Sequence, residues 1–193
     1  WKKESPMTNE LHAQHNVARH ALLNQRGLLL DKMSRSKPKE MSQNELQDIC
    51  GANNLNALLY HISDSMSFAL VIQPDTLALI PLDIRRDLLN TQIYNLMAPL
   101  HDVTAEGLDS IQFHANVAHD LYATIFQPIT EQISLSENLF VVPSMDLLNL
   151  PFEMLLTDSP QSKTYTPRDS ADYAPLFLQH KYTFTYSPTL APL

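Results

Sequence analysis

The only cysteine of the 193-residue sequence, Cys50, is its only candidate for a thiol nucleophile. We predict that Cys50 ends a short helix, where the negative end of the helix dipole raises a thiol pKa and disfavours the reactive thiolate. A base could still approach it through the fold, but the pattern favours a small buried hydrophobic side chain. A single cysteine also excludes an internal disulfide and a multi-cysteine zinc site. We therefore expect a reducing, cytoplasmic setting.

The histidines lack the spacing of a metal site. His15 and His20 are five residues apart, whereas the helical zinc motif places two histidines four apart with a glutamate between them. We expect solvated or rim positions for the histidines that could otherwise be ligands or bases. These are His12, His15, His20, His114, His119 and His180.

Glu153 is the carboxylate with the most suggestive neighbours, since it follows Leu150-Pro151-Phe152. A glycosidase would need a second carboxylate across a cleft, and no other acidic residue is marked out for that role. We expect Glu153 to accept backbone N–H bonds beside a sheet, and Phe152 and Leu155 to be core residues. The sequence thus predicts no catalytic residue, no metal site and no cofactor site.

Charge and glycine content exclude several classes of function. The chain has 13 basic and 21 acidic residues, a net charge of -8, which argues against binding to nucleic acid or to an anionic membrane. The basic pairs 2–3 and 85–86 are expected to be a frayed terminus and a solvated helix start. The three glycines, Gly27, Gly51 and Gly107, are too far apart for a phosphate-binding loop. No apolar run approaches the roughly 18 residues of a membrane-spanning helix.

The elements that must position these residues follow from periodicity. Residues 9–35 are predicted to form an amphipathic helix. Ser42 and Glu45 form a capping box for a helix that ends at Cys50-Gly51, where the glycine supplies a left-handed cap. Runs at 55–62, 66–73 and 76–82, separated by turn residues, predict an antiparallel meander.

The second half of the chain predicts helices over 85–100 and 108–133, the latter kinked at Pro128. The continuous apolar run 139–142 predicts a strand buried on both faces of a parallel sheet. A short helix after Pro151, a polar loop over 158–174 and a last strand over 182–186 complete the expected elements. Such a sheet needs further elements to cover it, so we expect an incomplete α/β domain. The opening residue, Trp1, likewise suggests a processed or excised piece.

Residues 142–155, 24–31 and 181–189 match three motifs in order, and together they resemble CHAT domains, the caspase-like domains associated with tetratricopeptide repeats and related to caspases and separases. Residues 142–155 resemble the signature V-P-D-G-x-L-x-x-L-P-F-E-x-L, with Ser144-Met145 in place of Asp-Gly. Residues 24–31, Asn-Gln-Arg-Gly-Leu-Leu-Leu-Asp, resemble the preceding N-R-K-G-x-x-L-D helix. Residues 181–189, Lys-Tyr-Thr-Phe-Thr-Tyr-Ser-Pro-Thr, are similar to the following Y-x-V-x-Y-x-P-S strand. All three occur in the family's order, and the likeness spans about residues 9–193.

The resemblance implies an incomplete caspase-like sandwich: a helical lead-in over 1–40, the end of an upstream TPR-like region, and the N-terminal part of a CHAT domain over 41–193. In that family the chain belongs to a cysteine endopeptidase whose catalytic His and Cys lie after the Y-x-P-S strand. This chain would then be inactive alone, with the remaining half-domain, upstream repeats or a second copy as partners, and a peptide substrate for the parent. The alternative is a non-catalytic protein–protein interaction module, or pseudo-peptidase, that pairs strands or helices. A third hypothesis is an independent hydrolase that uses Cys50 or Glu153.

Overall fold

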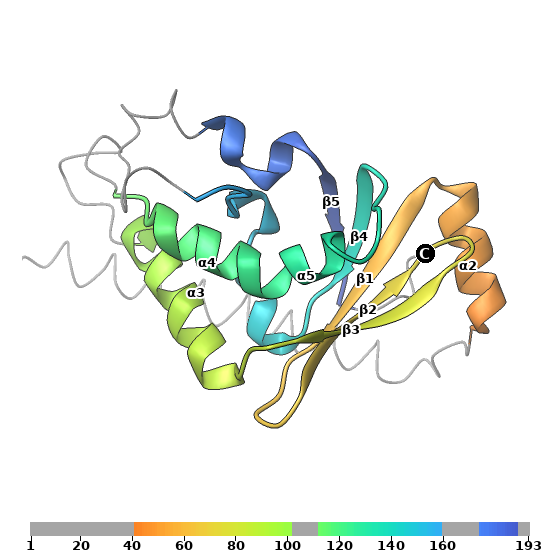
Figure 1. The fold of residues 1–193 in the computed structure, drawn as a ribbon, viewed down its shortest axis with the longest axis horizontal. Helices are drawn as coiled ribbons and strands as arrows, with labels where there is room; N and C mark the ends of the chain where they lie inside the picture. The colour runs from red at the N-terminus through yellow and green to blue at the C-terminus, as the bar shows by residue number, and fades with distance from the viewer. Residues whose placement is uncertain (1–40, 102–111, 160–173, 189–193) are drawn as a thin grey trace, which may run out of the picture. The chain divides into compact units, whose positions relative to one another are not determined.

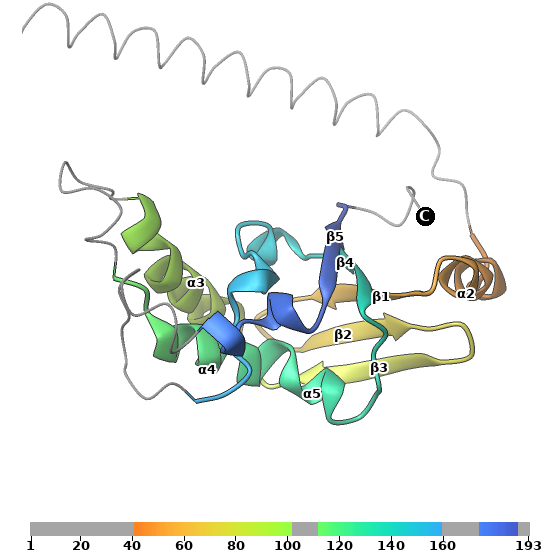
Figure 2. The same cartoon turned by 90° about the horizontal axis from the view of Figure 1, so that it is seen from above.

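The computed structural model describes residues 41–101, 112–159 and 174–188 (Figures 1 and 2). The predicted helix over 9–35, with His12, His15 and His20, lies outside these residues, as do the basic pair 2–3 and most of the predicted loop over 158–174. The helices are α2 (Gln43–Ala52), α3 (Arg86–His101), α4 (Ala115–Ile125) and α5 (Gln127–Thr130). The strands are β1 (Leu55–His61), β2 (Ser67–Ile72), β3 (Leu77–Leu82), β4 (Asn138–Val142) and β5 (Thr183–Tyr186). Short 3-10 turns are η2 (Met145–Leu147), η3 (Phe152–Met154), η5 (Ala174–Leu176) and η6 (Leu178–His180).

The five strands form one mixed sheet in the order β3-β2-β1-β4-β5. β1, β2 and β3 make the predicted antiparallel meander, in which Leu58 lies opposite Val71. β4 pairs in parallel with β1 on one side and with β5 on the other, and Leu58 also lies opposite Val141. The α/β class, the meander and the interior parallel strand are therefore confirmed.

The two faces of the sheet are covered unequally. The main core lies on one face, where α3, α4, α5 and the 3-10 turns pack against alternate strand residues such as Leu58, Val71 and Val141. On the other face Cys50 of α2 packs with Ala57, Ile72 and Phe140. The figures show α2 at the opposite side of the sheet from α3 and α4 (Figures 1 and 2). Because Phe140 faces α2 while Leu139 and Val141 face the main core, β4 is buried on both faces as expected.

The start of α2 follows the prediction and its end does not. Ser42 and Glu45 form the reciprocal capping box. Gly51 lies inside the helix, so the predicted glycine cap is wrong. The Asn53 side chain donates to the Ile49 carbonyl at 2.9 Å, and Asn54 adopts the left-handed conformation with φ of 49°. Asparagine tolerates this conformation better than most residues, so the two asparagines replace the glycine.

The helix predicted over 108–133 is two helices where the structure describes it. α4 ends at Ile125 and the four-residue α5 begins at Gln127, with Pro128 in its first turn. A proline has no N–H to donate and its ring clashes with the carbonyl four residues earlier, so the chain breaks at Phe126 instead of bending smoothly. The short helix expected after Pro151 is the single 3-10 turn η3.

Within the described ranges, no helix combines the length and apolar character needed to cross a bilayer.

Candidate functional site

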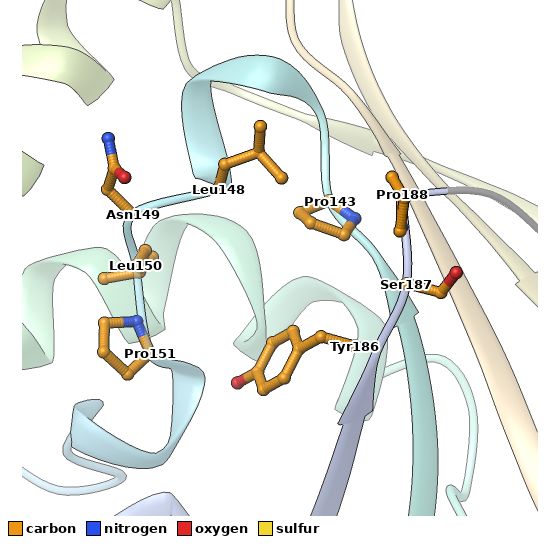
Figure 3. A pocket seen from close by; sticks show the side chains of 8 residues that line it. All are labelled: Pro143, Leu148, Asn149, Leu150, Pro151, Tyr186, Ser187 and Pro188. Atoms are coloured by element: carbon orange, nitrogen blue, oxygen red, sulfur yellow. The ribbon is translucent and has the colours of Figure 1, made fainter. Parts of the chain in front are cut away.

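A pocket of about 400 Å³ opens where the parallel strands β4 and β5 end (Figure 3). The carboxyl ends of parallel strands are the common place for binding sites in α/β sheets. One wall is the segment after β4 and the other is the end of β5 with the two residues that follow. The lining is mostly apolar and comprises Pro143, Leu148, Asn149, Leu150, Pro151, Tyr186, Ser187 and Pro188.

The Tyr186 hydroxyl joins the two walls. It donates to the Glu153 carboxylate at 2.6 Å and accepts the backbone N–H of Phe152 at 2.9 Å. Burial, followed by the hydrogen bond to Glu153, raises the pKa of Tyr186 well above its ordinary value, so the phenol stays protonated and donating. Glu153 was expected to accept backbone N–H groups. Instead it accepts a phenol from 33 residues away, because β5 brings Tyr186 over the start of η3.

Phe152 anchors the same segment in the core. Its side chain is fully buried, and its ring centroid lies 5.3 Å from that of Tyr60, 6.0 Å from Phe184 and 6.3 Å from Tyr186. These separations lie in the range in which aromatic pairs attract one another. Leu155 is also fully buried, so both predictions of core positions are confirmed.

A second hollow of about 480 Å³ lies between α3 and η2 and shares Asn149 with the first. Asp146 in its wall forms an ion pair with Arg86, N to O 3.3 Å, and accepts from Asn90 at 3.2 Å. Arg86 also donates to the Ile62 carbonyl at 3.1 Å. Arg85 and Arg86 are both exposed at the start of α3, as predicted, and Arg86 in addition ties the start of α3 to the segment after β4.

Cys50 lies apart from both hollows. It is fully buried in the small cluster under α2. Burial raises the pKa of its thiol, and a hydrogen bond with the Ala57 backbone opposes this rise without overcoming it. An inaccessible thiol with a raised pKa is a poor nucleophile, which matches the prediction of a small hydrophobic residue.

The described histidines serve separate local contacts. Nδ1 of His114 is 2.9 Å from the Asn95 carbonyl, and Nδ1 of His119 is 3.2 Å from the Leu156 carbonyl. His180 is exposed at the end of η6, as expected. Among the residues that the structure describes, no three His, Cys, Asp or Glu side chains are grouped as metal ligands would be.

The site offers an apolar cavity, one phenol and one carboxylate, with no nucleophile paired with a base. A mostly apolar cavity with a few polar groups is the usual lining of a site that binds an apolar group. Sequence reasoning named Glu153 and missed the pocket and Tyr186. One signal was available in the sequence. Glu153 comes after the first predicted parallel strand and Tyr186 ends the second, and the carboxyl ends of paired parallel strands meet at one edge of a sheet.

No protein-family model, no curated protein and no solved structure matches this chain.

Proposed function

We propose that this chain is the N-terminal part of a CHAT-type caspase-like cysteine endopeptidase domain, to which it contributes scaffold and no catalytic group. One observation carries the proposal. Glu153, in the stretch that resembles the L-P-F-E signature, receives the hydroxyl of Tyr186, in the stretch that resembles Y-x-P-S. Two stretches that were chosen separately for their likeness to one family thus meet through one motif residue from each stretch.

The departure from the signature is compatible with the local backbone. Ser144 and Met145 stand where the family has Asp-Gly, and a glycine would be needed if the turn used a left-handed conformation. Ser144 is extended, with φ of -63°, and Met145 begins η2. Among the described non-glycine residues only Asn54 has a positive φ, so this turn functions without glycine.

In this proposal the chain supplies the meander, the covering helices and the parallel pair β4 and β5, which hold the rest of the domain in register. The catalytic His and Cys would belong to sequence after the Y-x-P-S strand. The partner is the rest of the domain, the substrate of the parent is a peptide, and no cofactor is required.

The test is to read the coding sequence beyond Leu193, express the longer product and measure hydrolysis of fluorogenic peptides beside this chain alone. We expect cysteine-dependent hydrolysis from the longer product and none from this chain. Tyr186→Phe in the longer product should lower the activity, with the exposed Tyr94→Phe on α3 as the matched control. A reading frame that stops at Leu193, or continues without both a catalytic His and Cys, refutes the peptidase proposal.

A second candidate is a non-catalytic protein-interaction module. It is favoured by the apolar side chains on β3, where Leu77 is 43% and Leu79 is 59% exposed. Leu79→Lys should leave stability almost unchanged if Leu79 is free, and should abolish partner binding if this face is an interface. Mass measurement in solution of the native chain and of the Leu79→Lys variant shows whether association is present and whether the substitution abolishes it.

A further inference from the structure

The face of the sheet on which α2 lies has a row of aliphatic side chains beyond the part that α2 covers. The strand register places Leu59 opposite both Leu70 and Val142. These three side chains pack against the cluster around Cys50, which puts them on the α2 face. Leu79 lies opposite Leu70 and points to the same face, as directly paired residues do. These four side chains, the aliphatic row, cross the sheet from β3 to β4, and the row is open at its β3 end, where Leu79 is 59% exposed.

A second row lies two residues further along the strands. Phe68 lies opposite His61 and Pro81, and the rings of His61 and Phe68 stack with their centroids 4.9 Å apart. Among the residues that the structure describes, the Cys50 cluster contains side chains from α2 and the strands only, and α2 lies at one end of the strands (Figures 1 and 2). The midpoint of the two rows is about 10 Å along the strands from the residues beneath Cys50, close to the spacing of about 8–10 Å between packed helices. The face therefore has room for one further helix beside α2.

The elements that carry this face are acidic and have neither lysine nor arginine. Residues 43–84, which comprise α2 and the three-stranded meander, contain no lysine and no arginine. The exposed carboxylates of the same stretch are Glu45, Asp48, Asp64, Asp75 and Asp83. Asp64 is in the turn after β1 and Asp83 directly follows β3, so both lie beyond the second row. The remaining carboxylates are on α2 and in the turn between β2 and β3. The face therefore lies in a negative field, which attracts cations and repels anions.

We propose that the aliphatic row and the second row form a docking site for a basic amphipathic helix of a partner protein. A helix is favoured because α2 packs on the neighbouring part of the same face, and because sheet faces in α/β domains are buried mainly by helices. Basic residues beside its apolar face are favoured by the surrounding carboxylates. A second copy of this chain is the poorer occupant, because its own α2 and meander carry the same negative charge. This inference rests on the interaction-module candidate above and does not depend on kinship with CHAT domains.

The test mixes the full chain with a fluorescently labelled synthetic peptide of about 18 residues, a length sufficient for a helix. Leucines lie along one face of the peptide helix and lysines along the other. We expect saturable binding in fluorescence polarisation that weakens as salt is raised. A scrambled peptide of the same composition, and a peptide with glutamate in place of lysine, should bind at least about tenfold more weakly. Methyl NMR spectra should show shifts at Leu59, Leu70 and Leu79 when the basic peptide binds.

Leu79→Lys should weaken binding of the basic peptide by at least about tenfold, because it places a charge in the aliphatic row and opposes the peptide lysines. Leu88→Lys on α3 is the matched control, since Leu88 is 52% exposed and the change of charge is the same. It should alter binding less than about twofold. Circular dichroism establishes that each variant is folded before binding is compared.

The proposal is overturned if the basic peptide does not bind, if either control peptide binds equally well, or if the methyl shifts fall on other side chains. Equal effects of Leu79→Lys and Leu88→Lys also overturn it. If Leu79→Lys abolishes association between copies of the chain while the basic peptide does not bind, the interaction module stands and this inference alone falls. None of these results bears on peptide hydrolysis by a longer product.

Discussion

Removing one oxygen atom, as Tyr186→Phe, tests the contact on which the candidate site is built. A hydrogen bond to a charged group contributes about 1.5–3 kcal/mol, and a buried donor left without its acceptor costs about 1–3 kcal/mol. The Tyr186→Phe variant loses the hydrogen bond to the Glu153 carboxylate and leaves the N–H of Phe152 without its acceptor. Because Tyr186 is 40% exposed, water can replace part of both. We therefore expect a loss of about 2 kcal/mol, just below the lower end of the summed range of about 2.5–6 kcal/mol.

The assay is urea unfolding followed by circular dichroism, together with a thermal melt in which the midpoint should fall by about 4–8 °C. Glu153→Gln keeps an acceptor but loses the charge, so it should cost about 1 kcal/mol. In the double variant the two effects should not add, because they share one hydrogen bond. Tyr94→Phe removes a hydroxyl from a side chain that is 71% exposed, and should change stability by less than about 0.5 kcal/mol. Equal effects of Tyr186→Phe and Tyr94→Phe, or strict additivity with Glu153→Gln, would refute the reasoning.

Three further predictions concern Gly51, Cys50 and the two tyrosines with raised pKa values. Gly51→Ala should raise the free energy of unfolding by about 0.5–1 kcal/mol, since the added Cβ would meet Pro74 at an ordinary 3.5 Å; a loss in urea unfolding would contradict the helix interior assigned to Gly51. Cys50→Ser should cost about 1–3 kcal/mol because it buries a hydroxyl, and the native thiol should react with Ellman's reagent far more slowly than in urea; equal rates would show an exposed cysteine. Tyr60 and Tyr186 have raised pKa values, Tyr60 mainly through burial and Tyr186 through burial and Glu153, so the folded state favours their protonated forms. That stabilisation is present below the unfolded pKa of about 10 and is lost as pH rises above it, so the urea midpoint should fall between pH 10 and 11, and less steeply in Tyr186→Phe; a flat profile would contradict it.

Local patterns predicted most of the secondary structure. The capping box at Ser42 and Glu45 depends on residues three apart, and it forms as expected. The meander follows from turn residues between short apolar runs, because such short links cannot cross over to a parallel strand. The end of α2 was harder to predict, because Gly51 and the two asparagines after it all offer a cap and only the packed helix selects among them.

The candidate site depends on contacts between residues distant in the sequence. Arg86 contacts Asp146, 60 residues away, and Tyr186 contacts Glu153, 33 residues away. No periodicity within a single helix or strand predicts either pair. Glu153 was noticed because of its neighbours, but its partner required knowing that β5 lies beside β4. Tyr186 reads in sequence as one of several strand aromatics, and only its place at the end of β5 distinguishes it.

Amino-acid order alone predicted the α/β class, the buried parallel strand and the burial of Cys50, because each follows from periodicity, residue size or charge among near neighbours. Folding in three dimensions decided the strand order, the pocket between residues 143–151 and 186–188, and the phenol–carboxylate contact beside it. The physical reason is that hydrophobic burial is non-directional. Hydrophobic burial specifies which side chains leave water. The pairing of distant polar groups is fixed only when the order and pairing of all the strands are fixed.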